Sequence, residues 1–148
     1  MATKDCLEWL RYARMDINYA QQGFSQQQNP RHRPIELILY HCQQGAEKAL
    51  KAYIINNLNS GIMLPRTLQP HDMQIIRQAC LKWSTQYNNA RIIGHCAFLD
   101  PFGVAIKYPQ YNRSVDSSHA ARGLNSAKRI YDFVCVQLRL EKAYFPKS

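Results

Sequence analysis

The sequence predicts an all-α protein, folded as an antiparallel up-and-down bundle of four main helices plus one short helix. Two observations carry this prediction. Apolar residues recur at steps of three and four in four segments of the 148-residue chain, which is the spacing of a helix buried along one face. Strand signals are poor throughout, and no internal repeat is visible. We expect one domain over residues 1–148, because this length suits a single hydrophobic core.

The first helix is expected over about Asp5 to Gln22 and ends at Gly23. The segment 23–34, "GFSQQQNPRHRP", has two prolines and no acidic residue, so it predicts a basic loop. The apolar positions of the first helix follow helical spacing: Leu7, Leu10, Ala13, Ile17 and Ala20.

The second helix is expected to start near Pro34, since proline is favoured in a first helical turn, and to run to about Asn57. The stretch "NNLNSGIMLPRTLQP" then breaks it. Its apolar stripe consists of eight residues: Ile38, Leu39, Cys42, Ala46, Ala49, Leu50, Tyr53 and Ile54.

The third helix is expected to begin at "HDM", where the carboxylate of Asp72 suits a cap or a first turn. Asn88-Asn89 ends it. Its apolar residues follow at steps of four, three and four: Ile76, Cys80, Trp83 and Tyr87.

A mixed segment, Ala90 to Arg113, precedes the last helix. "RIIGHCAFL" predicts one short helix stopped by Asp100-Pro101, and "KYPQYNR" predicts extended or looped chain because Pro109 restricts the residue before it. The last helix is expected over about Ser114 to Tyr144, capped by Ser114. Its apolar seam alternates steps of four and three: Ala120, Leu124, Ala127, Tyr131, Val134 and Leu138.

Composition limits the class of protein. The net charge of +9 favours a polyanionic partner such as RNA, DNA, a nucleotide or an acidic protein. No apolar run is long enough for a membrane span, and the charged start "MATKD" does not resemble a signal peptide. The five cysteines are odd in number and widely spaced, which indicates reduced thiols in the cytoplasm. His41-Cys42 and His95-Cys96 are adjacent pairs that make no compact metal site alone, so we expect neither a metal nor another cofactor.

Four motifs in order resemble those of the HEPN domain family. They are "ARMDINYA" in the first helix, "HCQQGAEKALKAYI" in the second, "HDM" opening the third, and "KYP" before an Ala-rich final helix. The set is most similar to the branch with an Arg-Tyr-Pro signature there, although Lys107 stands where that branch has Arg. The resemblance implies a helical bundle that often forms a homodimer. It also implies a small prokaryotic protein of the kind commonly encoded beside a minimal nucleotidyltransferase, as a toxin–antitoxin pair.

The resemblance also implies a polar ligand groove built around the second helix. Two interpretations stay open: a groove that binds a nucleotide or nucleic acid, and a polar network that holds the bundle or a dimer together. The expected groove residues are Asp16, Gln43, Gln44, Glu47, Lys48, Lys51, His71, Asp72, Lys107 and Tyr108.

A second candidate site is "RSVDSSH", Arg113 to His119. HEPN ribonucleases carry an Arg and then a His at the start of the late helix. Histidine supplies an acid or base near neutral pH, and arginine supplies a cation beside the phosphorane oxygens. In the ribonucleases a polar residue, often Asn, usually follows the Arg, whereas here Ser114 follows it, and the Tyr-Pro branch generally lacks the Arg–His pair. The alternative is that Arg113 is a loop cation and His119 a surface residue.

These observations favour a nucleotide-linked or nucleic-acid-linked binding module that pairs with a minimal nucleotidyltransferase. The alternatives are a metal-independent endoribonuclease and a non-catalytic dimerisation domain. Several further cations extend a basic surface on which a polyanion can bind: Arg31, Arg33, Arg122, Lys128 and Arg129.

Overall fold

The computed structural model describes residues 2–26, 35–58, 72–105 and 115–140. Over these residues the chain is all-α and contains no strand. None of the helices in these ranges is long and apolar enough to cross a membrane. The elements are α1 (Lys4–Gln26), α2 (Ile35–Leu58), α3 (Met73–Cys80), the 3₁₀ helix η3 (Thr85–Asn88), α4 (Ala90–Leu99), α5 (Phe102–Ala105) and α6 (Ser117–Gln137).

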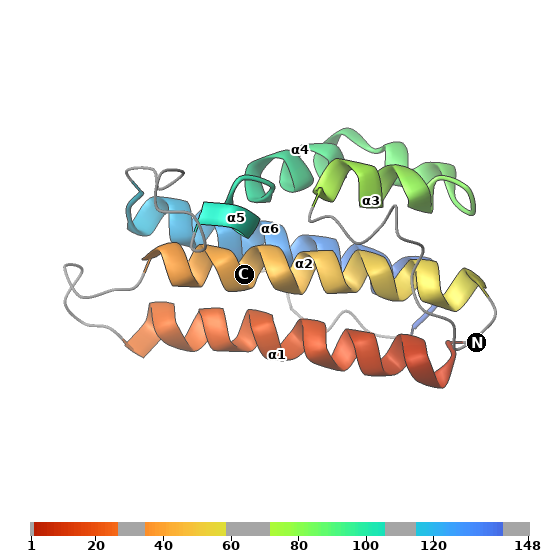
Figure 1. The fold of residues 1–148 in the computed structure, drawn as a ribbon, viewed down its shortest axis with the longest axis horizontal. Helices are drawn as coiled ribbons and strands as arrows, with labels where there is room; N and C mark the ends of the chain where they lie inside the picture. Colours follow the sequence, from red (N-terminus) through yellow and green to blue (C-terminus); the bar gives the residue numbers. More distant parts are fainter. Residues whose placement is uncertain (1, 27–34, 59–71, 106–114, 141–148) are drawn as a thin grey trace.

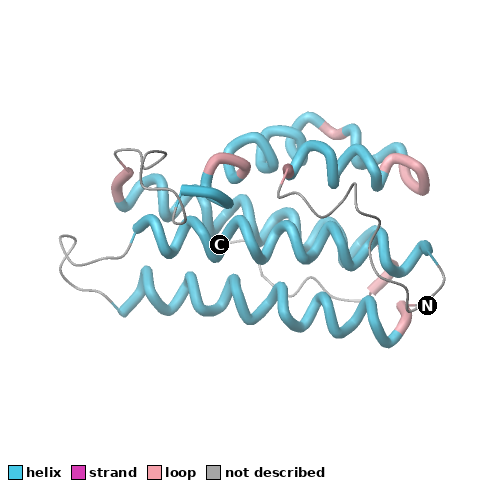
Figure 2. The backbone as a smooth tube through the Cα atoms, viewed as in Figure 1, coloured by secondary structure: helices cyan, strands magenta, loops and turns pink. Residues whose placement is uncertain are grey.

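The long helices α1, α2 and α6 lie side by side, and α3 and α4 cover one side of α2 and α6 (Figure 1). The start of α1 meets the end of α2, where the Thr3 N–H donates to Asn56 Oδ1 at 2.8 Å. The helices α1, α2, α4 and α6 alternate in direction, so the predicted up-and-down bundle is confirmed. Helices make up nearly all of the described chain, with short turns between α3 and α4 (Figure 2).

Two glycines allow α2 to approach its neighbours closely. A Cβ on Gly45 of α2 would lie 2.6 Å from Ile17 Cγ1 of α1. A Cβ on Gly123 of α6 would lie 2.6 Å from Leu39 Cδ2 of α2. The apolar stripes predicted for α2 and α6 are buried throughout. In α1 the prediction for Leu7 is wrong: Leu7 is 47% exposed, and its neighbour Cys6 is buried.

The third predicted helix is split. α3 ends at Cys80, and Ser84 takes an extended backbone whose side chain accepts the Gln86 N–H and caps η3. The buried guanidinium of Arg77 donates to the Tyr87 carbonyl at 3.0 Å and holds η3 against α3. These local hydrogen bonds compete with a continuous helix, although Tyr87 is still fully buried, as its spacing predicted.

The last helix is shorter than predicted at both ends. Asp116, and not Ser114, is its N-cap, because the Asp116 carboxylate accepts the N–H groups of Ser118 and His119. The helix ends at Gln137, and Arg139 has a φ of 60°, in the left-handed region that ends a helix. Residues 141–144 of the expected helix lie outside the described residues.

Candidate functional site

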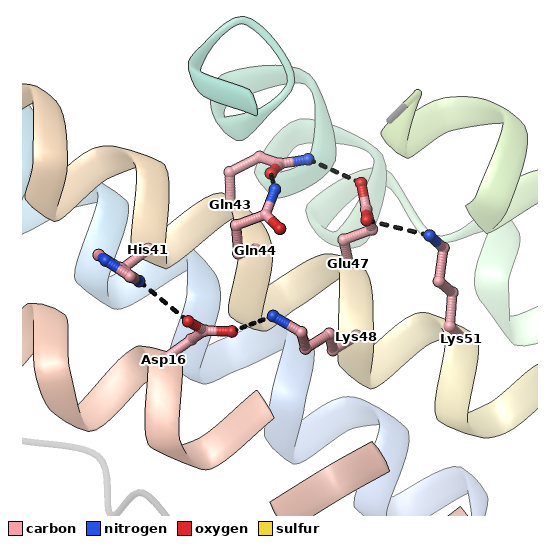
Figure 3. A network of polar contacts seen from close by, with 7 residues as sticks. All are labelled: Asp16, His41, Gln43, Gln44, Glu47, Lys48 and Lys51. Carbon is pink, nitrogen blue, oxygen red and sulfur yellow. Dashed lines mark hydrogen bonds and ion pairs between the residues drawn. The ribbon is translucent and has the colours of Figure 1, made fainter. Parts of the chain in front are cut away.

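Of the expected groove residues that the structure describes, all but Asp72 fall into two separate networks on different faces of α2 (Figure 3). The Asp16 network joins Asp16 of α1 to His41 and Lys48 of α2. The Glu47 network lies within α2 on the side that faces α3 and α5, and its members are Gln43, Gln44, Glu47 and Lys51. His71, Lys107 and Tyr108 lie outside the described residues.

The Glu47 network links three side chains at four-residue spacing, Gln43, Glu47 and Lys51, and adds the adjacent Gln44. Gln44 Nε2 donates to Gln43 Oε1 at 2.7 Å, and Gln43 Nε2 donates to Glu47 Oε1 at 3.1 Å. Lys51 Nζ donates to the other Glu47 oxygen at 3.0 Å. Glu47 is 3% exposed and Lys51 is 6% exposed. These hydrogen bonds offset the cost of burying two charges.

The helix α5 closes over this network. A Cβ on Gly103 would lie within 3.0 Å of all three amide atoms of the Gln43 side chain, so only glycine fits there without a shift. Gln43 itself is fully buried. The network is therefore packed between elements and helps to hold α5 on α2.

Asp100 is an acidic neighbour that the sequence did not single out. It accepts the Met73 N–H at 2.8 Å and so anchors the start of α3. Burial, together with the nearby carboxylates of Asp72 and Glu47, raises the pKa of Asp100. Asp72 is the N-cap of α3, as its position predicted, and accepts the N–H groups of Gln74 and Ile75.

The Asp16 network is partly open to solvent. One Asp16 oxygen lies 2.9 Å from His41 Nδ1, and the other accepts from Lys48 Nζ at 2.5 Å. Burial acts to raise the pKa of Asp16, but the hydrogen bonds from His41 and Lys48 outweigh it and lower that pKa. The carboxylate is therefore ionised at neutral pH, and His41 must carry its proton on Nδ1 to donate to it. The second ring nitrogen, Nε2, is then available to a ligand.

Aromatic side chains border the Asp16 network. The Tyr19 ring centroid lies 4.6 Å from that of His41, and the Tyr40 centroid lies 5.4 Å away. Tyr12, Met15 and Tyr19 are about half exposed on α1. A cation, a histidine and exposed rings in one place suit a ligand that has both a phosphate and a base. Sequence reasoning missed His41, although its seven-residue spacing from Lys48 puts both on one face of α2.

The second candidate site is only half visible, because Arg113 lies outside the described residues. His119 stands in the first turn of α6 with 41% of its side chain exposed. Its Nδ1 lies 3.2 Å from the Asp116 backbone nitrogen and 2.9 Å from Asp116 Oδ1. Neutral imidazole can accept the backbone N–H, and protonated imidazole can donate to the carboxylate, so His119 stabilises the helix start in either form.

All five cysteines are buried free thiols. Burial raises the pKa of Cys6, Cys42 and Cys96 to about 12. These thiols are therefore protonated and unreactive at neutral pH. Within the described ranges, His, Cys, Asp and Glu side chains form no group of three that could hold a metal ion.

Comparisons with known proteins identify the fold family. No curated protein and no solved structure matches the chain significantly. A family model described as HEPN domain matches residues 6–139, which includes both networks and the start of α6. The chain therefore belongs to the HEPN domain family.

Proposed function

We propose that this HEPN domain is a binding module for a nucleotide or a nucleic acid and that it acts as the partner of a minimal nucleotidyltransferase in a toxin–antitoxin-type pair. The observation that carries the binding role is the Asp16 network. It sets an ionised carboxylate, a lysine and a histidine with a free ring nitrogen beside an exposed tyrosine. The net charge of +9 supports an anionic ligand.

Each group has a role in this proposal. Asp16 holds the imidazole of His41 and the ammonium of Lys48 in place. Lys48 then donates to a phosphate, and Nε2 of His41 donates to it when the imidazole is protonated. The ring of Tyr19, 55% exposed, offers a face on which a base stacks. With His41 neutral the network carries no net charge, and with His41 protonated it carries one positive charge.

The exposed face of α1 supports a protein partner. Tyr12, Met15 and Tyr19 follow helical spacing and present apolar side chains to solvent. We propose that this face contacts the nucleotidyltransferase or a second copy of the chain, since HEPN domains often dimerise. Light scattering of the protein alone and mixed with its nucleotidyltransferase tests both contacts, with Tyr12→Ser/Tyr19→Ser expected to weaken the one that uses this face.

The binding role is tested by calorimetry with ATP and with a short oligouridylate. Lys48→Ala and His41→Gln are expected to weaken binding of whichever ligand the wild type takes up. Lys82→Ala, at the turn after α3, removes one exposed cation far from the network and is the matched control. Equal affinities in all four proteins would reject the Asp16 network as the site.

The second candidate function is a metal-independent endoribonuclease. The supporting observation is His119, which is partly exposed in the first turn of α6 and is held at Nδ1 by Asp116. RNA cleavage in EDTA, lost in both His119→Ala and Arg113→Ala, would support it. Asp116→Ala keeps the histidine and removes the capping oxygen, so it controls for loss of the helix start. No cleavage by the wild type, freed from any partner, would reject the enzyme.

A chain that neither binds nor cleaves but forms dimers would be the non-catalytic dimerisation domain.

A further inference from the structure

The helices α4 and α6 pack in opposite directions and present two matching stripes. On α4 the stripe runs at steps of four and three through Arg91, His95 and Phe98. On α6 the same steps connect three residues: Arg122, Ser126 and Arg129. Residues at these spacings share one face of a helix. The α4 stripe therefore lies along the side of α4 that is turned toward α6, and the α6 stripe lies along the side of α6 that is turned toward α4.

Two side-chain contacts fix the register between the stripes. The Arg122 guanidinium lies over the Phe98 ring, 4.2 Å from its centroid. One α4 turn earlier and one α6 turn later, His95 Nδ1 lies 2.8 Å from Ser126 Oγ. The next step of the same register brings Arg91 of α4 to the level of Arg129 of α6.

Positive charge accumulates along this interface. Arg91 and Arg122 are exposed, while Arg129 is largely buried and lies 3.4 Å from the carboxylate of Asp132. Burial lowers the pKa of His95, and the charges of Arg122, Arg129 and Arg91 lower it further. Thus the positive charges of three arginines act on the imidazole of His95, and the carboxylate of Asp132 offsets the charge of Arg129.

We propose that the α4–α6 face, defined by Arg91, Arg122 and Arg129 around His95, binds successive phosphates of a nucleic-acid chain. Arg91 and Arg129 lie at one level, and Arg122 lies the equivalent of seven residues from both, about 10 Å along the helices, so the three cations are too spread out for one phosphate. Arginine's planar fork suits phosphate oxygens, and the exposed guanidinium groups of Arg91 and Arg122 remain accessible to them.

This face is distinct from the Asp16 network. The α1 helix, which carries Asp16, and the α4 helix lie on opposite sides of the bundle (Figure 1). Binding of a nucleic acid at the α4–α6 face is therefore independent of ligand binding at the Asp16 network, and the two can be tested separately. Lys128, beside Arg129 in sequence, does not belong to the face, because it donates to Gln21 of α1.

His95 provides a direct readout. Phosphates bound beside the arginines offset their charge, so NMR titration of the His95 ring should give a higher pKa with a short oligouridylate than without it. ATP should raise it less, because one nucleotide spans fewer of the cations. A polyglutamate peptide is the control for charge alone, because guanidinium groups also pair with carboxylates, and it should raise the pKa less than the oligouridylate does. An equal rise with ATP would overturn the assignment to a chain of phosphates, and an equal rise with polyglutamate would overturn the assignment to phosphate.

Binding as a function of salt provides the second test. Arg91→Gln and Arg122→Gln are each expected to weaken oligouridylate binding several-fold and to lower the slope of log affinity against log salt by about 1. Arg11→Gln is the matched control, an exposed arginine of α1 paired with Glu8. Unchanged affinity and slope in both α4–α6 variants would overturn the proposal. Lys48→Ala should leave the His95 response intact, so loss of ligand at the Asp16 network and loss at this face are distinguishable.

Discussion

The carboxylate of Asp16 on α1 lies 2.9 Å from Nδ1 of His41 on α2, and its second oxygen accepts from Lys48 two turns along the same helix. One side chain thus fixes α1 against two turns of α2. Because it is both a tie between helices and the centre of the proposed ligand site, its titration should affect stability as well as binding.

Acid should weaken this tie. The hydrogen bonds from His41 and Lys48 lower the pKa of Asp16 below its ordinary 3.8. The resulting stability is complete above that value and is lost as the pH falls through the lower pKa of the folded state. Asp16→Asn should therefore reduce the free energy of unfolding at neutral pH and flatten its decline below pH 3.8. Urea denaturation at a series of pH values measures this, and a variant with the wild-type decline would contradict it.

Asp100 should behave in the opposite way. Burial raises its pKa above 3.8, so the folded state holds this proton more tightly than the unfolded chain. Stability is then lost as the pH rises from 3.8 through the higher folded-state pKa. Asp100→Asn keeps an oxygen that can accept the Met73 N–H, and it should raise the free energy of unfolding at neutral pH. The same denaturation series tests it, and a loss of stability at neutral pH would show that the carboxylate itself is needed.

The sequence predicted the elements that depend on long periodic patterns and missed those that depend on contacts between distant residues. The seam of α6 was recognised because each buried residue, such as Leu124 or Tyr131, recurs at helical spacing. The split between α3 and η3 was missed, since the helical spacing of the apolar residues continues to Tyr87 while Ser84 and Arg77 interrupt the backbone.

The candidate site follows the same rule. The positions of Gln43, Glu47 and Lys51 on one face of α2 were predictable from their four-residue spacing, and the structure places them there. Their burial under α5 and the pairing of Asp16 with His41 were not predictable, because each requires knowing which helix packs on which face. Periodicity gives the face of a helix, but it does not give the neighbour.

Because α1 packs closely on α2, a glycine-to-alanine change in α2 should destabilise the protein, and the same change in α4 is its control. Alanine normally stabilises a helix interior relative to glycine, by about 0.5–1 kcal/mol. At Gly45 the added Cβ would meet Ile17 at 2.6 Å and the Ala13 carbonyl at 3.0 Å, so Gly45→Ala should instead cost about 1–3 kcal/mol. At Gly94 of α4 nothing lies within 4 Å, and Gly94→Ala should stabilise the protein. Urea denaturation of both variants measures the change in the free energy of unfolding. Stabilisation in both variants would show that α1 and α2 separate easily.

The buried thiols should report on unfolding. All five cysteines are buried, and burial raises the pKa of Cys6, Cys42 and Cys96 to about 12. The native protein should therefore react slowly with an aromatic disulfide reagent at mildly alkaline pH, and all five thiols should react in denaturant. Fast labelling of any thiol without denaturant would indicate that the surrounding helices open readily.

Substitutions in the buried Glu47 network should lower the free energy of unfolding and leave ligand binding unchanged. Lys51→Met removes the ammonium that lies 3.0 Å from Glu47 Oε2 and leaves a carboxylate that is 3% exposed, so it should cost about 3–5 kcal/mol. Adding Glu47→Gln removes the carboxylate charge that Lys51 had compensated and should recover much of that loss, because the amide can still accept from Gln43. A double-mutant cycle from urea denaturation gives the coupling energy, and ATP titration of the double variant should match the wild type if the network only supports α5. Weakened nucleotide binding in a double variant of wild-type stability would instead place a ligand against this side of α2.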